Sequence, residues 1–294
     1  MKSSSFTNQE KIPIIIGPTA IGKTEYALDL AQRVDAEIIS ADSMQVYKYM
    51  DVGTAKPDKK QLTLCKHHLI SIIKPDEDWN LHIFLNIVRK LLASKDKKYI
   101  ICGGTGLYIR ALIHNFETPE IPGNKEVRVA LEKIAAERGS EYLYKELQKV
   151  DITSADAISP QDKYRIIRAL EVYKTFSRPL SELKRRDESY ADRFQLICLN
   201  TSRENLYRRI NDRVDIMIKK GLFEEVQMLL TKGYGIDLVS MQALGYKESA
   251  RYLQGIVGKE ECIELIKKRT RNFAKRQLTW YRSFSNINRV EIES

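Results

Sequence analysis

The segment from Gly17 to Thr24 constrains this chain most, because it matches the pattern Gly-x-x-x-x-Gly-Lys-Ser/Thr at every fixed position. An apolar run rich in β-branched residues precedes it at residues 12–16, and apolar residues at helical spacing follow it up to residue 34. This order of strand, loop and helix predicts a phosphate-binding loop at the N-terminus of a helix.

The loop predicts a binding site for a diphosphate or a triphosphate. Backbone N–H groups of such a loop converge on one anion, and the side chain of Lys23 adds a positive charge. The hydroxyl of Thr24 is placed to hold a Mg²⁺ cofactor that bridges phosphate oxygens. A glycine-rich turn that binds nothing is the alternative, but the flanking strand and helix disfavour it. The predicted phosphate-binding residues are Gly17, Pro18, Thr19, Ala20, Ile21, Gly22, Lys23 and Thr24.

The composition is typical of a soluble protein, with an excess of positive charge. Lys and Arg number 49 against 39 Asp and Glu, which gives a net charge of +10. A nucleic-acid partner or a lysine-biased surface would explain this charge equally well. The chain has no long apolar run and residues 1–11 are polar, so we expect neither a membrane span nor a secretory signal. Its four scattered cysteines predict reduced thiols in the cytoplasm and no structural metal site.

Strand and helix patterns alternate along most of the chain. Apolar runs predict further strands at residues 37–40, 68–73, 98–102 and 194–199, with amphipathic helices among them. This order predicts parallel βαβ winding. Two prolines and a glycine at residues 118–123 indicate a domain boundary, and only helical patterns follow up to residue 190. The predicted fold is α/β: a P-loop NTPase-like parallel sheet core of residues 1–117 and 191–294, with an all-helical insertion of residues 118–190.

The ends of two predicted strands bear on the chemistry. Asp42 follows the second strand at the sheet edge that carries the phosphate loop, so it is a candidate acid/base or metal ligand. The alternative is an Asx turn that only caps the next residues. The strand at residues 98–102 ends in Gly103-Gly104 rather than in an acidic residue, which disfavours ATP hydrolysis. These glycines predict room for a large group over the sheet edge.

Two predicted helices carry basic faces. Ser159-Pro160 predicts the start of a helix on which Arg165 and Arg168 share one face. The last long helix, near residues 259–284, combines an apolar stripe with a separate basic face. That face consists of Lys268, Arg271, Lys275 and Arg282. Its regular spacing favours contacts with a phosphate backbone over a merely solvated surface.

Eight segments in order along residues 14–282 together resemble the tRNA dimethylallyltransferase family. They are GPTAIGKT at 17–24, SADSMQVYK at 40–48, DVGTAKP at 51–57, HHL at 67–69, GGTGLY at 103–108, RALEV at 168–172, QALGYKE at 242–248 and TRNFAKRQLTW at 270–280. The phosphate loop alone is unspecific, but the ordered set is specific. The chain departs from the family pattern at Ile21, where many members have Ser, and at Ile87, where bacterial members often have Asp.

The resemblance implies a reaction and a role for each catalytic residue. The family transfers a dimethylallyl group from dimethylallyl diphosphate to N6 of the adenosine 3′ of the anticodon, position 37, in tRNAs that read codons beginning with U. By this resemblance Asp42 is the general base, and Thr19 reaches the bridging oxygen of the diphosphate. Arg213 closes on the diphosphate from the far side, and Lys23 neutralises its charge together with Mg²⁺ held by Thr24.

The resemblance also implies where the anticodon stem-loop of tRNA binds. The flipped nucleotide would lie near Asp42, Ser43, Met44, Gln45 and Thr105. The insertion would hold the stem-loop through Arg128, Tyr164, Arg165, Ile166, Ile167 and Arg168. We expect a cytoplasmic monomer with no membrane partner.

Two other functions stay open at this point. A nucleotide-dependent kinase would hold ATP in the loop and use Asp42 to activate a hydroxyl, but the missing acidic residue after the strand at 98–102 disfavours it. A non-enzymatic RNA-binding protein with the same fold would leave Asp42 without a role.

Overall fold

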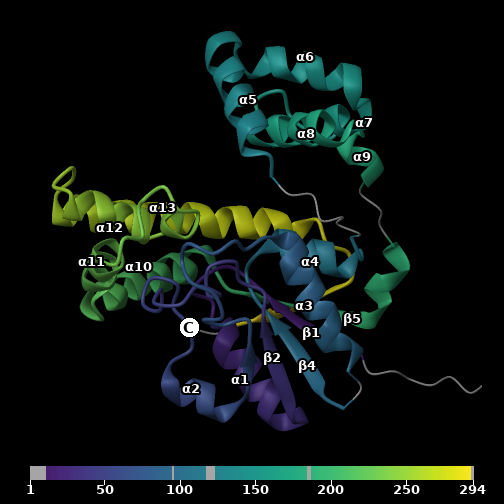
Figure 1. Cartoon of the computed structure of the whole chain (residues 1–294). Coiled ribbons are helices and arrows are strands. Elements are labelled where there is room, and N and C mark those ends of the chain that lie inside the picture. Colours follow the sequence, from purple (N-terminus) through teal and green to yellow (C-terminus); the bar gives the residue numbers. More distant parts are fainter. Residues whose placement is uncertain (1–10, 95, 117–122, 184–186, 293–294) are drawn as a thin grey trace, which may run out of the picture. The chain divides into compact units, whose positions relative to one another are not determined.

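The computed structural model of this 294-residue chain describes residues 11–94, 96–116, 123–183 and 187–292. Two compact units make up the chain: Met1–Arg110 with Asp192–Ser294, which we call the core, and Ala111–Ala191, which we call the insertion (Figure 1). Of the predicted boundary segment at residues 118–123, all but Gly123 lies outside the described residues.

The core is built on a six-stranded sheet in the order β3-β2-β4-β1-β5-β6, and its pairings are parallel. The strands are β1 Ile12–Ile16, β2 Ala36–Ser40, β3 His67–His68, β4 Lys98–Cys102, β5 Phe194–Asn200 and β6 Ile287–Glu291. The predicted parallel α/β core is therefore confirmed. β3 is shorter than the predicted 68–73, because Leu69 and Ser71 turn the backbone with φ of 64° and 52°. β6 was not predicted, since this edge strand is mostly exposed and lacks an apolar run.

Helices cover the sheet and extend beyond one end of it (Figure 1). In the core they are α1 Lys23–Val34, α2 Lys59–Leu64, α3 Leu81–Ala93, α10 Arg203–Lys219, α11 Leu222–Thr231, α12 Tyr246–Leu253 and α13 Lys259–Arg282, with the short 3-10 turn η2 Ser240–Gln242. Two elements, α4 Gly106–Ile113 and the 3-10 turn η1 Glu188–Arg193, run across the boundaries between the units. Ser202 caps α10, because its side chain accepts a hydrogen bond from the backbone N–H of Asn205.

Apolar side chains from distant segments join in the core. Ile21, at the variable position of the phosphate loop, is fully buried and packs in one cluster with Leu199 of β5 and Ile210 of α10. A second cluster joins the residues after β2, such as Met50, with α10 to α13. The apolar residue at position 21 therefore anchors the phosphate loop to the core. Among the described residues, no helix is both long enough and apolar enough to cross a membrane.

The insertion is helical throughout its described part. Its helices are α5 Lys125–Arg138, α6 Ser140–Val150, α7 Ile152–Asp156, α8 Lys163–Phe176 and α9 Leu180–Leu183. The predicted start of α8 at Ser159-Pro160 is wrong: Asp162 is the N-cap, and its carboxylate accepts from the backbone N–H of Arg165. Ile166 and Ile167 are buried in the apolar core of this unit. RNA contacts through these two side chains, which the resemblance implied, are therefore not expected.

Candidate active site

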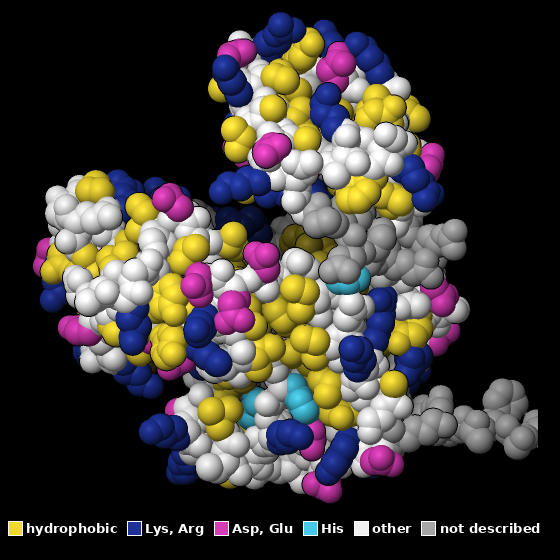
Figure 2. All heavy atoms as spheres, in the orientation of Figure 1, with side chains coloured by type: hydrophobic (Ala, Val, Ile, Leu, Met, Phe, Trp, Pro, Cys, Tyr) yellow, Lys and Arg dark blue, Asp and Glu magenta, His cyan; other side chains and the backbone are white. Residues whose placement is uncertain are grey.

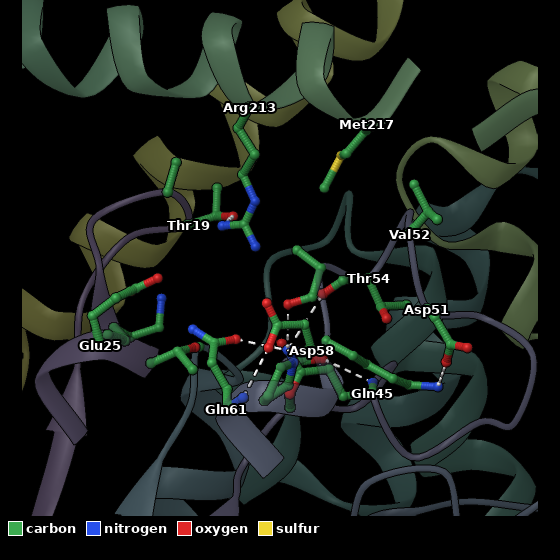
Figure 3. A pocket seen from close by; sticks show the side chains of 18 of the residues that line it. Thr19, Glu25, Gln45, Asp51, Val52, Thr54, Asp58, Gln61, Arg213 and Met217 are labelled. Carbon is green, nitrogen blue, oxygen red and sulfur yellow. Dashed lines mark hydrogen bonds and ion pairs between the residues drawn. The ribbon is translucent and has the colours of Figure 1, made fainter. Parts of the chain in front are cut away.

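A cavity of about 1010 Å³ lies in the core where several strands end at one edge of the sheet. The segments after β1, β2 and β4 line it with Thr19, Asp42 and Gly103. In parallel α/β sheets this edge is where ligands bind. Figure 3 shows Arg213 and Met217 pointing into the cavity from α10, with Thr19 close to the guanidinium of Arg213.

Both fixed glycines of the phosphate loop are required by its backbone. Gly17 has φ of 153°, and a Cβ atom there would lie 2.9 Å from the carbonyl oxygen of Leu199. Gly22, with φ of 100°, is the residue from which α1 begins. The loop therefore turns tightly enough to direct the first N–H groups of α1 into the cavity, and such N–H groups attract anions.

Lys23 lies folded over its own loop. Its Nζ donates to the carbonyl oxygens of Gly17 at 3.0 Å and Pro18 at 2.9 Å. Burial lowers the pKa of Lys23 to about 8, and the neighbouring charge of Arg213 also lowers it, whereas Cys102 and Asp42 act in the other direction. A bound phosphate would favour the charged form, so this lysine is suited to an anionic ligand.

Two arginines of α10, Arg209 and Arg213, contact the phosphate loop from outside it. Arg213 Nη1 lies 3.5 Å from Thr19 Oγ1, and burial lowers the pKa of this arginine while Glu25 and Asp42 raise it. Arg209 was not predicted as a site residue; its Nε donates to the carbonyl oxygen of Ala20 at 3.0 Å. Its spacing of four residues from Arg213 on a helix was the available signal.

Asp42 forms a turn and also lies at the cavity. Its Oδ1 accepts from the backbone N–H of Met44 at 2.8 Å and of Gln45 at 3.3 Å, which is an Asx turn. The same residue lines the cavity. The turn fixes the carboxylate just beyond the C-terminal end of β2, so this structural role is compatible with a catalytic one.

The other residues implied for the flipped nucleotide gather around Asp42. The backbone N–H of Ser43 donates to Thr105 Oγ1 at 3.1 Å. Gln45 accepts from Ser40 Oγ at 3.1 Å, and its Nε2 donates to the carbonyl oxygen of Thr54 at 3.3 Å. Segments 62 residues apart are thus joined in one rigid wall.

The glycines after β4 pack closely against other parts of the protein. A Cβ atom at Gly103 would lie 2.2 Å from the carbonyl oxygen of Ala41, and one at Gly104 would lie 2.4 Å from Nε2 of Gln277. These glycines are therefore needed for close packing of protein against protein, although both line the cavity. The cavity provides space over this edge of the sheet, but the absent side chains of the two glycines make way for neighbouring protein atoms.

A carboxylate of α11 holds another wall of the cavity. Glu225 accepts from the backbone N–H groups of Asp51 and Val52 at 2.8 Å and of Gly53 at 3.2 Å. The hydroxyl of Tyr246 donates to the same carboxylate at 2.6 Å. Sequence reasoning missed Glu225, because nothing in the local pattern links α11 to a loop more than 170 residues earlier.

The cavity offers oxygen ligands suited to Mg²⁺. Thr24 and Asp42 both line it, and Mg²⁺ in phosphate sites takes one or two protein oxygens together with phosphate oxygens and water. Within the described ranges, no group of three or more His, Cys, Asp or Glu residues could form a metal site by itself. The residues therefore fit a cation that is bound together with a phosphorylated ligand.

Comparisons with known proteins identify the family. Residues 45–284 match the family model described as IPP transferase. The chain is 44% identical over 293 residues to the tRNA dimethylallyltransferase of Acetivibrio thermocellus, covering 97% of this chain and 94% of that protein. The chain belongs to the tRNA dimethylallyltransferase family.

Solved structures of the family agree with this assignment. The crystal structure of the tRNA isopentenylpyrophosphate transferase from Bacillus halodurans is similar with a TM-score of 0.69 and 39% identity, covering 96% of this chain and 90% of that one. A eukaryotic dimethylallyltransferase solved while acting on tRNA is similar with a TM-score of 0.73 and 26% identity, covering 96% and 74%.

In the insertion of this family member, two arginines predicted to bind tRNA face a buried carboxylate. Arg128 Nη2 lies 3.0 Å and Arg168 Nη1 2.9 Å from Oε2 of Glu171, whose side chain is 1% exposed. The backbone N–H of Asn124 also donates to Glu171, at 2.7 Å. Arg128 thus joins α5 to α8, whereas Arg168 pairs with Glu171 within α8, and the sequence suggested neither role.

The remaining predicted RNA contacts of the insertion lie on its surface. Tyr164 is 81% exposed, and the side chain of Arg165 is 61% exposed with Asp162 at 3.3 Å. These two residues are therefore accessible to a ligand, unlike Ile166 and Ile167.

Changing Glu171 to Gln is expected to destabilise the insertion by about 1–3 kcal/mol, because two guanidinium groups lose their shared charge partner. Burial raises the pKa of Glu171, but hydrogen bonds from Arg168 and Arg128 outweigh it and hold the pKa below the ordinary value of 4.5. This stability is present above pH 4.5 and is lost as the pH falls through the lowered pKa. Urea denaturation at several pH values measures the effect.

The control for this experiment is Glu182→Gln, since the Glu182 carboxylate is 57% exposed and lies 3.8 Å from Arg178. An exposed pair contributes little, so this change should leave the urea midpoint nearly unaltered. Equal midpoints for both variants would show that the Glu171 cluster does not stabilise the insertion.

Proposed function

We propose that this enzyme transfers a dimethylallyl group from dimethylallyl diphosphate to N6 of the adenosine at position 37 of tRNA, 3′ of the anticodon, in tRNAs that read codons beginning with U. We place it in the cytoplasm as a monomer. The main support is that Asp42 and the phosphate loop line one cavity. Membership of the family supports the same reaction.

In the proposed reaction, the phosphate loop holds the leaving diphosphate. The C–O bond between the dimethylallyl group and the diphosphate breaks, so negative charge develops on the bridging oxygen. Lys23 and Arg213 reach the loop from opposite sides and stabilise this charge, and the hydroxyl of Thr19 beside Arg213 is placed to donate to it. When bound, Mg²⁺ would neutralise charge on the phosphate oxygens, with Thr24 as its protein ligand.

Asp42 would act on the nucleophile. The exocyclic amine of adenine is a poor nucleophile until a base removes its proton, and the carboxylate of Asp42 is fixed by its turn at the cavity. A bond forms between N6 and the allylic carbon, and the proton of N6 passes to Asp42. The adenine must leave its stack to reach this position, where Ser43, Gln45 and Thr105 form a preorganised wall.

The core carries the positive charge available for RNA. Residues 111–191 contain fourteen Lys and Arg and fourteen Asp and Glu, so the net charge of +10 belongs to the core. On the face drawn in Figure 2, Lys and Arg side chains are spread widely. The outward face of α13 has charge of one sign only, because its exposed residues from Lys268 to Arg282 include no acidic side chain.

The helix α13 borders the cavity, and its exposed face lies on the opposite side of the helix from the cavity. The exposed residues of α13 from Lys268 to Arg282 are Lys268, Asn272, Lys275, Arg276, Thr279 and Arg282, and all but Arg276 recur every three or four residues. Phe273 and Gln277 of the same helix line the cavity. We therefore propose that α13 provides phosphate contacts close to the site of transfer, and that Tyr164 and Arg165 contact the stem-loop from the insertion.

Changing Lys275 or Lys268 to Ala is expected to weaken binding of every tRNA and to reduce the slope of log affinity against log salt by about one unit each, because each lysine releases counterions from one phosphate. Titration of an anticodon stem-loop at several salt concentrations measures both quantities. Lys259→Ala is the matched control, since this lysine is exposed on the same helix beside Glu260 and Glu261. Unchanged slopes for Lys275 and Lys268 would place the RNA elsewhere.

The function itself is tested by mixing the protein with an unmodified anticodon stem-loop, dimethylallyl diphosphate and Mg²⁺. We expect the RNA to gain the mass of one dimethylallyl group on the adenosine at position 37. A stem-loop with guanosine at that position is the control. RNA that binds but gains no mass would contradict the proposed transfer.

A further inference from the structure

One side chain of α13 joins two loops of the active site. Gln277 is buried, and its Oε1 accepts from the backbone N–H of Thr19 at 2.8 Å. Its Nε2 donates to the carbonyl oxygen of Gly104 at 2.9 Å. The glutamine amide therefore connects the phosphate loop after β1 with the segment after β4, and each of its two ends has a matching partner.

The neighbouring contacts leave little freedom at this junction. One turn further along α13, the hydroxyl of Tyr281 lies 3.2 Å from the carbonyl oxygens of both Gly17 and Gly104. A Cβ atom at Gly106 would lie 3.0 Å from the ring of Trp280. Because α13 is seated this closely, a change in the Gln277 side chain acts directly on the backbone of the loop.

The hydrogen bond that the backbone N–H of Thr19 donates to Gln277 affects both the backbone and the side chain of Thr19. The backbone N–H of Thr19 is used by the glutamine and so does not point at a phosphate. Its hydroxyl, in contrast, lies 3.5 Å from Arg213 Nη1 on the cavity side. Fixing the backbone of this residue therefore fixes where its hydroxyl lies.

We propose that Gln277 is a positioning residue for group transfer, because it holds the Thr19 hydroxyl at the oxygen that leaves with the diphosphate. The role of that hydroxyl rests on the proposed function. Gln277 makes no contact with the reacting atoms in this mechanism, and it acts on the reaction through the backbone of Thr19. Small displacements of an aligned group cost rate, so loss of the glutamine should slow the chemical step more than it weakens binding.

A double-mutant cycle tests the proposal. Gln277→Met has similar length without either hydrogen bond, and it should lower kcat by on the order of 10²-fold with the KM for the stem-loop nearly unchanged. In a Thr19→Ala background the same change should have little further effect, because residues that act as a unit are not additive. A full additional loss in that background, or a wild-type rate for Thr19→Ala alone, would overturn the proposal.

Thr270→Val is the matched control. Thr270 is also a buried polar residue of α13, but its hydroxyl donates to the carbonyl oxygen of Ile266 within the helix. This variant should keep kcat within about two-fold of wild type, because it disturbs no contact with the phosphate loop. A loss of kcat equal to that of Gln277→Met would mean that any buried polar change in α13 has this effect, and would overturn the specific role.

Hydrogen exchange of the Thr19 amide gives a readout independent of activity. The amide should be protected in the wild type and in Gln277→Glu, which keeps an acceptor, and should exchange faster in Gln277→Met. If the wild-type protein did not prenylate RNA, the proposed function would fail, while this measurement would still report whether Gln277 holds the loop. Equal exchange in wild type and Gln277→Met would overturn the positioning role.

Discussion

Changing Asp42 to Asn is expected to slow prenyl transfer by roughly 10²–10⁴-fold, the usual contribution of a general base, while both substrates still bind. Asparagine retains a side-chain oxygen that can accept from the backbone N–H groups of Met44 and Gln45, so the Asx turn is kept. What is lost is the carboxylate that accepts the proton of the adenine N6. The substitution therefore separates the catalytic role of Asp42 from its structural one.

Single-turnover transfer at saturating substrate concentrations is the measurement for this variant, together with stem-loop affinity. Asp58→Asn is a matched control: Asp58 lines the same cavity and caps α2 through Gln61, and asparagine is also a good N-cap. We expect a transfer rate close to wild type for the control. A near wild-type rate for Asp42→Asn would mean that another group takes the proton.

Changing either Lys23 or Arg213 to Ala is expected to slow transfer by roughly 10²–10³-fold, because each removes a charged donor from the developing negative charge. Lys23 holds the loop side and Arg213 the α10 side of the diphosphate in the proposed mechanism. Neither lies among the proposed RNA contacts, so stem-loop affinity should be nearly unchanged in both variants.

Titration with inorganic diphosphate, followed by single-turnover transfer, distinguishes the possible roles of these two residues. Because the pKa of Lys23 is lowered to about 8, the affinity of the free enzyme for diphosphate should fall as the pH rises above 8, and Lys23→Ala should lose this dependence. Lys220→Ala is the control, as a lysine at the end of α10 that lines the same cavity. A loss of RNA affinity in Arg213→Ala would assign Arg213 to the RNA surface instead.

Local patterns were sufficient for the centre of the candidate site. The strand, the glycines and Lys23-Thr24 lie within thirteen consecutive residues. Their fixed spacing is that of a strand followed by a phosphate-binding loop and a helix. Asp42 could be placed for the same reason, since a residue that follows a parallel strand lies at the ligand-binding edge of the sheet. The apolar periods also predicted most of the helices and strands correctly, but a strand such as β6, which is exposed at an edge, has no such period.

Contacts between distant segments were decided by the tertiary structure alone. Periodicity showed that one face of α13 is buried, but not that Gln277 on that face reaches a loop 258 residues earlier. In the same way, helical spacing grouped Arg165 with Arg168 on one face, whereas Glu171 pairs Arg168 with Arg128 from another helix. A sequence pattern reports which side of an element avoids water. Which partner it meets there depends on the packing of the whole chain, and that packing determined the environment of every residue around the phosphate loop.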